Sequence, residues 1–443
     1  MKLSKRQLLW NIGAAGVGLH AALGGSTPAR AGVGWGPGPN SGLPFWLGAH
    51  GDFDALKGLM PVARSLDLVA EGEGEGTYTE TALRAKFWRN KIWHRYLITG
   101  QASAFHWSSS PFCSGNTFVV PTAWPTSAAA VTSTTHLNCS RPPTYTGTES
   151  LSEQASKQRR VWQIAADGWL DQQWRDKMLA FKRDYFIANG LKNIRIILRS
   201  CKELNTMPVR WGSRAFERSY GMMVLTSADD YRLVRMGMSR YFDVFLDIFG
   251  NRQAGIVNDY AYSADQLWPY WNTVKKHQGP VDVRLACPDN AKIVGPDYYD
   301  FWPASFTDAI WNKELIRTSP QGWPIGLQRW LEWARQIGKP LALGEFGLMA
   351  KSITATGERP PSEGWDNPAF IKLMLDFCTA NASDIAFVNY FNRDNSASEA
   401  LPAHLMKPWD GIDSPTASCE RTPPGDNLRC GARAFRQWMA SHP

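Results

Sequence analysis

Short runs of apolar residues alternate along the chain with longer stretches in which apolar residues recur every three or four positions. Such runs are typical of strands buried in a parallel sheet, and the recurring positions are typical of one apolar helix face. We predict strands at eight places: 45–50, 66–70, 96–104, 193–199, 281–286, 292–297, 338–347 and 384–391. The segment 251–280 gives no clear pattern.

Helices are predicted in several of the intervals between these strands. The clearest lie around 174–185, from a capping box at Ser227 up to Gly250, at 327–337 and at 367–380. Helices that alternate with apolar strands favour a parallel α/β fold with right-handed crossovers. We expect a single (β/α)8 TIM barrel over residues 45–443. A doubly wound sheet is the weaker alternative, because no glycine-rich phosphate loop follows an early strand.

Two segments depart from this pattern. Residues 32–44 are rich in Gly and Pro and are predicted to be a linker. Residues 108–153 are rich in Ser, Thr and Pro and lack helical periodicity, which predicts a long inserted loop. Insertions of this length within a compact domain are usually functional or disordered.

The seven cysteines fit an oxidising compartment. Cys113 with Cys139, and Cys419 with Cys430, are close in sequence within polar, Pro-rich segments, and we predict both pairs to be disulfides, the first of which would hold the inserted loop. Three further cysteines lie in or beside apolar segments and are predicted to be buried thiols: Cys201, Cys287 and Cys378.

The first residues have the composition of an export signal. Lys2, Lys5 and Arg6 precede an apolar stretch at 8–23, and Ala29-Arg30-Ala31 supplies a cleavage site. We predict that residues 1–31 are a signal peptide and that the mature protein is periplasmic or secreted. Lys5 stands where the first arginine of a twin-arginine signal belongs, so both that route and the Sec route stay open. No later apolar run is long enough to predict a membrane span.

The formal net charge of +8 is compatible with an acidic polymer as a partner. The basic residues are spread along the chain, however, which is typical of an ordinary solvated surface, and no motif indicates nucleic-acid binding. No Cys/His spacing indicates a metal site. We expect a monomer without a cofactor or metal.

Glu345 ends a strongly apolar segment and is flanked by Gly344 and Gly347. In a parallel barrel the C-terminal ends of the strands carry the chemistry, so a carboxylate in this place indicates a catalytic site. A structural interpretation is also open, in which Glu345 is the buried partner of an arginine such as Arg199.

Glu203 offers a second carboxylate, because it follows the apolar strand that ends at Arg199. Cleavage of a glycosidic bond uses two carboxyl groups, one that protonates the leaving oxygen and one that attacks the sugar carbon or activates water. Strands of one barrel would place Glu203 and Glu345 at the same rim. The alternative for Glu203 is a residue of a surface loop.

Three segments resemble glycoside hydrolase family 26, the clan A retaining β-glycanases typified by endo-β-mannanases. Residues 167–205, followed by Trp211, resemble the region of the family's acid/base glutamate. Pro296–Trp302 is similar to its sixth-strand motif, and Trp330–Leu348 resembles its seventh helix and nucleophile strand. Weaker similarity at Phe105–Trp107 and Asn389–Asn392 extends the resemblance over most of residues 45–395.

The resemblance implies three catalytic roles. Glu345 would be the nucleophile, Glu203 the acid/base, and Tyr299 the tyrosine that hydrogen-bonds the nucleophile. It also implies a retaining double displacement, for which the two carboxyl groups should lie ~5 to 5.5 Å apart.

Two places differ from the family pattern. Lys202 stands where a histidine or aromatic residue is expected, and Thr206–Pro208 replaces the usual glycine and aromatic residue. A cation beside Glu203 opposes the raised pKa that a general acid needs, unless strand geometry points the two side chains to opposite faces. Alternatively, Lys202 binds a hydroxyl or carboxylate group of the substrate, as an acidic polysaccharide would provide.

The 21 tryptophans include candidates for sugar binding, since an indole can stack on the apolar face of a pyranose ring. Most are expected to belong to the core. We predict substrate contacts from residues that follow strand ends: Lys202, Asn205, His106, Trp107, Trp211, Trp302 and Tyr390. A structural hydrogen bond is an equally good interpretation of His106.

The leading hypothesis is thus a secreted, retaining, endo-acting β-glycoside hydrolase, mannanase-like, that acts on a polysaccharide. The alternative is a non-catalytic glycan-binding protein on a degenerate barrel. A periplasmic solute-binding protein is a third possibility that the number of predicted strands disfavours.

Overall fold

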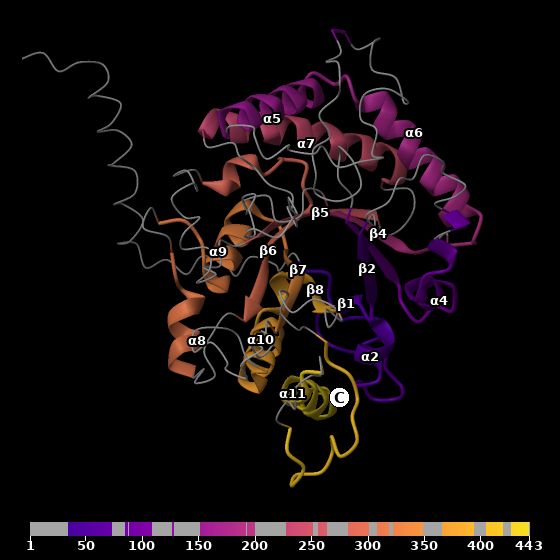
Figure 1. Ribbon diagram of the computed structural model, residues 1–443, viewed down its shortest axis with the longest axis vertical. Coiled ribbons are helices and arrows are strands. Elements are labelled where there is room, and N and C mark those ends of the chain that lie inside the picture. The colour runs from indigo at the N-terminus through magenta and orange to yellow at the C-terminus, as the bar shows by residue number, and fades with distance from the viewer. Residues whose placement is uncertain are drawn as a thin grey trace, which may run out of the picture. The chain divides into compact units, whose positions relative to one another are not determined.

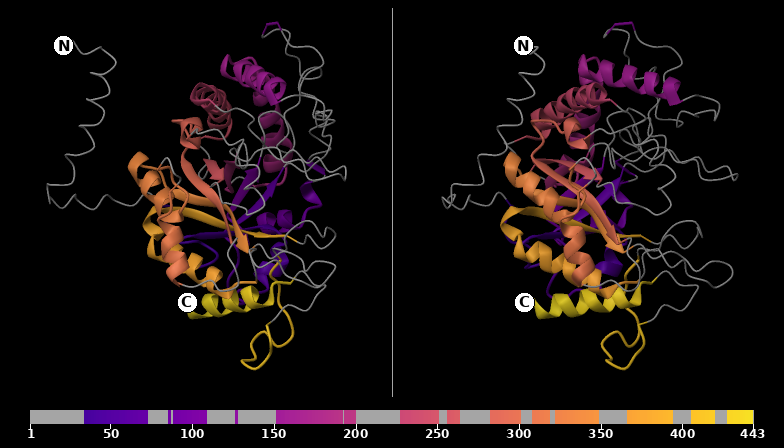
Figure 2. Two further views of the ribbon diagram at one scale, coloured as in Figure 1. Left: turned by 60° about the vertical axis from the view of Figure 1, so that its left-hand side comes forward. Right: turned by 90° about the vertical axis from the view of Figure 1, so that its left-hand side faces the viewer.

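The computed structural model describes residues 34–72, 85–86, 88–108, 126–127, 151–191, 193–199, 227–250, 256–263, 282–300, 308–318, 322–348, 366–393, 405–419 and 427–442. Within these residues the strands β1 to β8 form a closed barrel in the order of the sequence, and helices cover its outside (Figure 1, Figure 2). The predicted parallel α/β barrel is therefore confirmed.

All strand pairs are parallel, and β1 pairs with β8 to close the barrel. The strands are β1 (Trp46–Gly51), β2 (Leu68–Gly72), β3 (Ala104–Ser108), β4 (Arg195–Arg199), β5 (Ile256–Ser263), β6 (Ile293–Asp300), β7 (Leu341–Leu348) and β8 (Ile385–Asn392).

The α-helices are α2 (Phe53–Lys57), α4 (Ile92–Ile98), α5 (Leu151–Ala166), α6 (Asp171–Phe181), α7 (Ala228–Phe249), α8 (Asp308–Leu315), α9 (Leu327–Ile337), α10 (Pro368–Ala380) and α11 (Arg429–Ser441). A π-helical turn (Lys182–Ile187) continues α6, and 3-10 turns lie at Val283–Ala286 and Ala382–Asp384. No helix among the described residues is long and apolar enough to cross a membrane.

Helix boundaries follow the predicted capping signals. The Ser227 side chain accepts a hydrogen bond from the backbone N–H of Asp230 (3.1 Å), which satisfies a free donor at the start of α7. At a helix C-terminus, α9 ends at Gly338, whose φ of 69° is a left-handed conformation that glycine adopts at low cost. This turn leads directly into β7.

Alternation along the strands separates two apolar cores. Outward side chains pack against the helices and form the larger core. The inward side chains near the N-terminal ends of the strands form a second, smaller one: Trp46, Leu68, Ala104, Ile197, Ile293, Ala342, Ala386 and Phe387. Two residues further along several strands the inward positions are polar, so the interior changes from apolar to polar toward the C-terminal ends.

An extra residue in β7 interrupts its alternation. Leu343 pairs with Val388 and Phe346 with Tyr390, so three residue steps on β7 match two on β8. Since Leu343 and Phe346 both belong to the outer core, the bulge lies at Gly344 and Glu345. The bulge aims Glu345 into the barrel.

Residues 34–44, expected to be a linker, instead pack against the barrel. The backbone N–H groups of Gly34 and Trp35 donate to the carbonyls of Ser383 (2.7 Å) and Ile385 (3.3 Å). The Trp35 ring packs on Trp46 and Phe387, with ring centroids 5.2 and 5.4 Å apart, and so covers the N-terminal end of the smaller core. Apolar contact, which Gly and Pro content does not reveal, fixes this segment.

Several predicted strands differ from those observed, most of them only by a few residues at one end. The segment 96–104 contains the end of α4, and β3 begins only at Ala104. Val283–Ala286 is a 3-10 turn capped by the Asp282 carboxylate, and the fifth strand is instead Ile256–Ser263, within the stretch that showed no clear pattern. The strand predicted at 66–70 begins two residues later.

The C-terminal segment is tied down covalently. Cys419 and Cys430 form the predicted disulfide, with Cα atoms 4.8 Å apart, just before and within α11. The Asp366 carboxylate accepts from the backbone N–H groups of Cys430 (2.7 Å) and Gly431 (2.6 Å) at the start of the same helix. Cys287 and Cys378 are buried thiols, as expected. The other three cysteines lie outside the described residues, and so does most of the predicted insertion at 108–153.

Candidate active site

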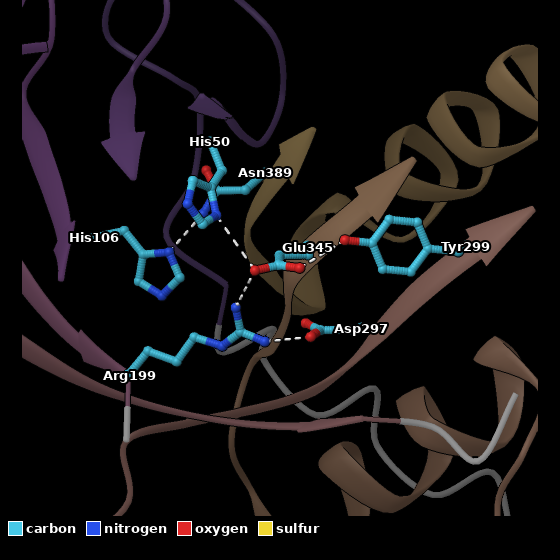
Figure 3. Close-up of polar contacts among 7 residues, drawn as sticks. All are labelled: His50, His106, Arg199, Asp297, Tyr299, Glu345 and Asn389. Atoms are coloured by element: carbon cyan, nitrogen blue, oxygen red, sulfur yellow. Dashed lines mark hydrogen bonds and ion pairs between the residues drawn. The ribbon is translucent and has the colours of Figure 1, made fainter. Parts of the chain in front are cut away.

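Glu345 is the centre of a buried polar cluster inside the barrel. Its side chain is 2% exposed, although it stands in the second half of β7. Six strands direct side chains into this region, and Figure 3 shows Glu345 surrounded by His50, Arg199 and Tyr299, with Asp297 beside Arg199. A carboxylate at this depth requires specific partners, since burial disfavours its charged form.

Three side chains contact the Glu345 carboxylate. The Arg199 guanidinium donates from Nη1 to Oε1 (2.9 Å), and Nδ1 of His50 lies 3.3 Å from the same oxygen. The Tyr299 hydroxyl donates to Oε2 (2.6 Å). The hydrogen bond that the family resemblance implied for Tyr299 is therefore present. Hydrogen bonds from a guanidinium and a hydroxyl favour the ionised carboxylate and fix its orientation.

Arg199 serves two carboxylates. Its Nη1 faces Glu345, and its Nη2 forms an ion pair with Oδ2 of Asp297 on β6. The side chains of Arg199 and Asp297 are 0% and 1% exposed. Arg199 is the inward residue two positions after Ile197 of the smaller core, which explains how it reaches the interior.

A second pair of polar side chains lies in the same interior. Nδ1 of His106 on β3 and the Asn389 side-chain amide on β8 are 2.8 Å apart, and both residues are fully buried. Gly48 on β1 makes room for this amide, because a Cβ there would lie 2.1 Å from Asn389 Oδ1. His106 thus makes the structural hydrogen bond that was one of its two interpretations.

Two of the predicted substrate contacts, those of Trp107 and Tyr390, are wrong. Trp107 and Tyr390 are fully buried in the outer core, where Trp107 packs on Phe181 of α6 and Tyr390 on Phe346 of β7. Alternation explains both errors, since residues next to an inward His106 or Asn389 must face outward. Burial also raises the pKa of the Tyr390 hydroxyl well above its ordinary value.

The remaining predicted site residues lie outside the described residues: Lys202, Glu203, Asn205, Trp211 and Trp302. Conversely, the site contains His50, Asp297 and Asn389, which were not predicted to contribute. Each is a polar residue in the C-terminal half of an otherwise apolar strand, and that position is the signal that would have found it. Among the described residues no group of three or more His, Cys, Asp or Glu side chains could hold a metal ion.

Comparisons with known proteins give no family. No protein-family model and no curated protein match the chain. Similar solved structures include a GH26 β-mannanase from Bacteroides ovatus, with 14% identity, coverage of 90% of this chain and 89% of that chain, and a TM-score of 0.40. A Bacteroidetes-affiliated GH5 cellulase has 13% identity, with coverage of 92% of this chain and 91% of that chain and a TM-score of 0.42. A Bacillus subtilis mannanase has 12% identity, with coverage of 80% of this chain and 81% of that chain and a TM-score of 0.34. At these values the matches carry no inference about activity.

Proposed function

We propose that this protein is a retaining β-glycoside hydrolase with Glu345 as its nucleophile. The observation that carries the proposal is the geometry of one carboxylate, buried in the C-terminal half of a barrel strand and held by Arg199, His50 and Tyr299. A nucleophilic carboxylate must be ionised and fixed in orientation, and these contacts favour both. The resemblance of Trp330–Leu348 to the nucleophile strand of family 26 supports the same role.

The reaction proceeds in two displacements. Glu345 attacks the anomeric carbon, the glycosidic C–O bond breaks, and the leaving oxygen takes a proton from a carboxylic acid, for which we propose Glu203. Water then attacks the same carbon, the ester bond to Glu345 breaks, and the proton of the water passes to Glu203. We propose that the enzyme is mannanase-like and cleaves a polysaccharide at internal bonds. Acidic polysaccharides are among the candidate substrates.

Alanine variants of the two carboxylates test this function. Purified protein is incubated with mannans, glucans, xylans and acidic polysaccharides, and new reducing ends are measured. Glu345→Ala and Glu203→Ala should each lower the rate on the accepted polymer by at least about a thousandfold, because each removes a reacting group. Glu332→Ala on the outer helix α9 is the control, since this side chain is 44% exposed and contacts Gln328 and Arg329 of its own helix. Unchanged hydrolysis by Glu345→Ala and Glu203→Ala would refute the assignment.

A glycan-binding protein is the second candidate, and one observation favours it. Arg199 and Glu345 also have the geometry of a buried structural ion pair, with side chains 0% and 2% exposed. In that case the protein binds a polysaccharide without releasing reducing ends. Glu345→Ala would then lower the melting temperature, and neither the wild type nor this variant would hydrolyse a polysaccharide.

We further propose that residues 1–31 direct export to the periplasm or the medium. The Cys419–Cys430 disulfide supports an oxidising compartment. Sequencing the N-terminus of the protein recovered from cell fractions tests this, since export with cleavage predicts a first residue near Gly32.

A further inference from the structure

Arg199 lies between two carboxylates in a place that is almost completely shielded from water. Its Nη1 donates to Glu345 and its Nη2 pairs with Asp297, and none of the three side chains is more than 2% exposed. The two carboxylates come from adjacent strands, β7 and β6, and approach different nitrogens of one guanidinium (Figure 3). One cation is thus shared by two anions.

A nucleophile of the proposed kind changes its charge during the reaction. Glu345 is an anion before attack and a neutral ester once the bond to the sugar has formed. Loss of one partner of a buried ion pair is strongly unfavourable, because the remaining charge is left uncompensated in a poorly solvated place. If Arg199 depended on Glu345 alone, formation of the ester would carry this cost.

We propose that Asp297 is a positioning residue that keeps Arg199 compensated while Glu345 is a neutral glycosyl ester. Asp297 does not touch the sugar and exchanges no proton. It holds the guanidinium in place through both displacements, so that Arg199 can restrain the Glu345 carboxylate again when water releases it. The catalytic part of this inference rests on the proposed function, whereas the charge coupling does not.

The other described side chains that face Glu345 do not replace Asp297. Tyr299 donates a hydrogen bond to Oε2, and His50 on β1 lies 3.3 Å from Oε1. The His106 and Asn389 pair, on β3 and β8, is joined by its own hydrogen bond. The structure describes ion pairs of Arg199 with two carboxylates, those of Glu345 and Asp297.

A double-mutant cycle tests the charge coupling without any substrate. Glu345→Gln mimics the neutral nucleophile, Asp297→Asn removes the second anion, and both keep the size of the side chain. Each single variant leaves Arg199 one of the two carboxylates, so each should melt close to the wild type. The double variant removes both of these ion pairs, and its melting temperature should fall by roughly 5 °C more than the sum of the single changes.

A rescue variant covers the case in which the double variant does not fold. Adding Arg199→Met to Glu345→Gln and Asp297→Asn removes the cation that has lost both described carboxylates and should restore folding. Additive melting temperatures in the cycle, or a double variant that the methionine does not rescue, would overturn the inference.

Kinetics of Asp297→Asn test the catalytic consequence. The rate constant kcat should fall on the order of 10-fold or more, since ester formation would then remove the second of the two described ion pairs of Arg199. The acid limb of the pH profile should also move to lower pH, because the Asp297 anion no longer shares Arg199 with the Glu345 carboxylate. Asp229→Asn, at an exposed site on α7, should change neither quantity. A normal kcat and pH profile for Asp297→Asn, in a protein that Glu345→Ala inactivates, would refute the inference and leave the proposed function standing.

Discussion

Tyr298 and Tyr299 are neighbours on β6 that face opposite sides of the barrel wall. Tyr299 donates to the Glu345 carboxylate, whereas Tyr298 belongs to the outer core. Tyr299→Phe removes one donor from the proposed nucleophile and little volume. We expect kcat to fall roughly 10- to 100-fold, with a loss of about 1 kcal/mol or less in the free energy of unfolding.

Tyr298→Phe is the matched control for that experiment. Its hydroxyl is buried on the helix side, where burial raises its pKa, so its removal should change stability and leave the hydrolysis rate as in the wild type. Equal rates for Tyr299→Phe and Tyr298→Phe would show that the hydrogen bond to Glu345 has no part in activity.

Sequence was sufficient for some residues of the site and not for others. Glu345 is predictable because a carboxylate after an apolar strand is unusual, whereas Arg199 follows from the sequence only as a partner for it. The prediction of Trp107 and Tyr390 as substrate contacts rests on their being aromatic and near strand ends. It leaves out the alternation of side chains along a strand, which turns both residues toward the helices. The bulge that aims Glu345 inward depends on pairing with β8, which no local pattern reveals.

An ion pair joins the helices α5 and α7, which lie side by side in Figure 1. Arg159 on α5 binds both carboxylate oxygens of Asp230 on α7 (2.6 and 2.9 Å), and the Asp230 side chain is 7% exposed. This hydrogen bonding lowers the pKa of Asp230 below its ordinary value. Asp230→Asn should therefore reduce the free energy of unfolding at pH 7 by on the order of 1 kcal/mol or less, since Arg159 is half exposed.

The sign of the pH dependence follows from the lowered pKa. The ionised Asp230 carboxylate stabilises the folded protein fully at pH values above the ordinary carboxyl pKa of about 4. This contribution disappears as the pH falls through the lower pKa that Asp230 has in the folded protein. Denaturation curves of wild type and Asp230→Asn should thus converge in acid. Asp229→Asn is the control, because its side chain is 92% exposed in the same first turn of α7. A constant difference between Asp230→Asn and wild type down to pH 2 would contradict the explanation.

Element prediction succeeded where caps and apolar periodicity agreed, as in α7 and α9. It failed at the fifth strand, because Ile256–Ser263 carries polar residues within the strand, whereas the apolar segment 281–286 forms a turn. Pairing on both sides with β4 and β6 defines β5, and such long-range contacts are absent from local sequence.

The whole barrel has two different ends, one polar and one closed by apolar contacts. Alternation of strands and helices was enough to predict the closed, parallel architecture, yet it gave no sign that residues 34–44 belong to it. At that end the Arg195 guanidinium of β4 lies over two rings, 4.2 Å from the centroid of Trp35 and 4.5 Å from that of Trp46. Burial lowers the pKa of Arg195, and cation–π contact offsets part of this cost.

Trp35 is consequently expected to stabilise the barrel from outside the strands. Trp35→Ala removes the contacts with Trp46, Phe387 and Arg195, and should reduce the free energy of unfolding by on the order of 2 kcal/mol, measured by denaturant titration. Trp35→Phe keeps an aromatic ring and should lose less than half of that. Because the proposed nucleophile lies toward the opposite ends of the strands, both variants should hydrolyse substrate at the wild-type rate below their melting temperatures. Wild-type stability of Trp35→Ala would mean that residues 34–44 are a linker after all.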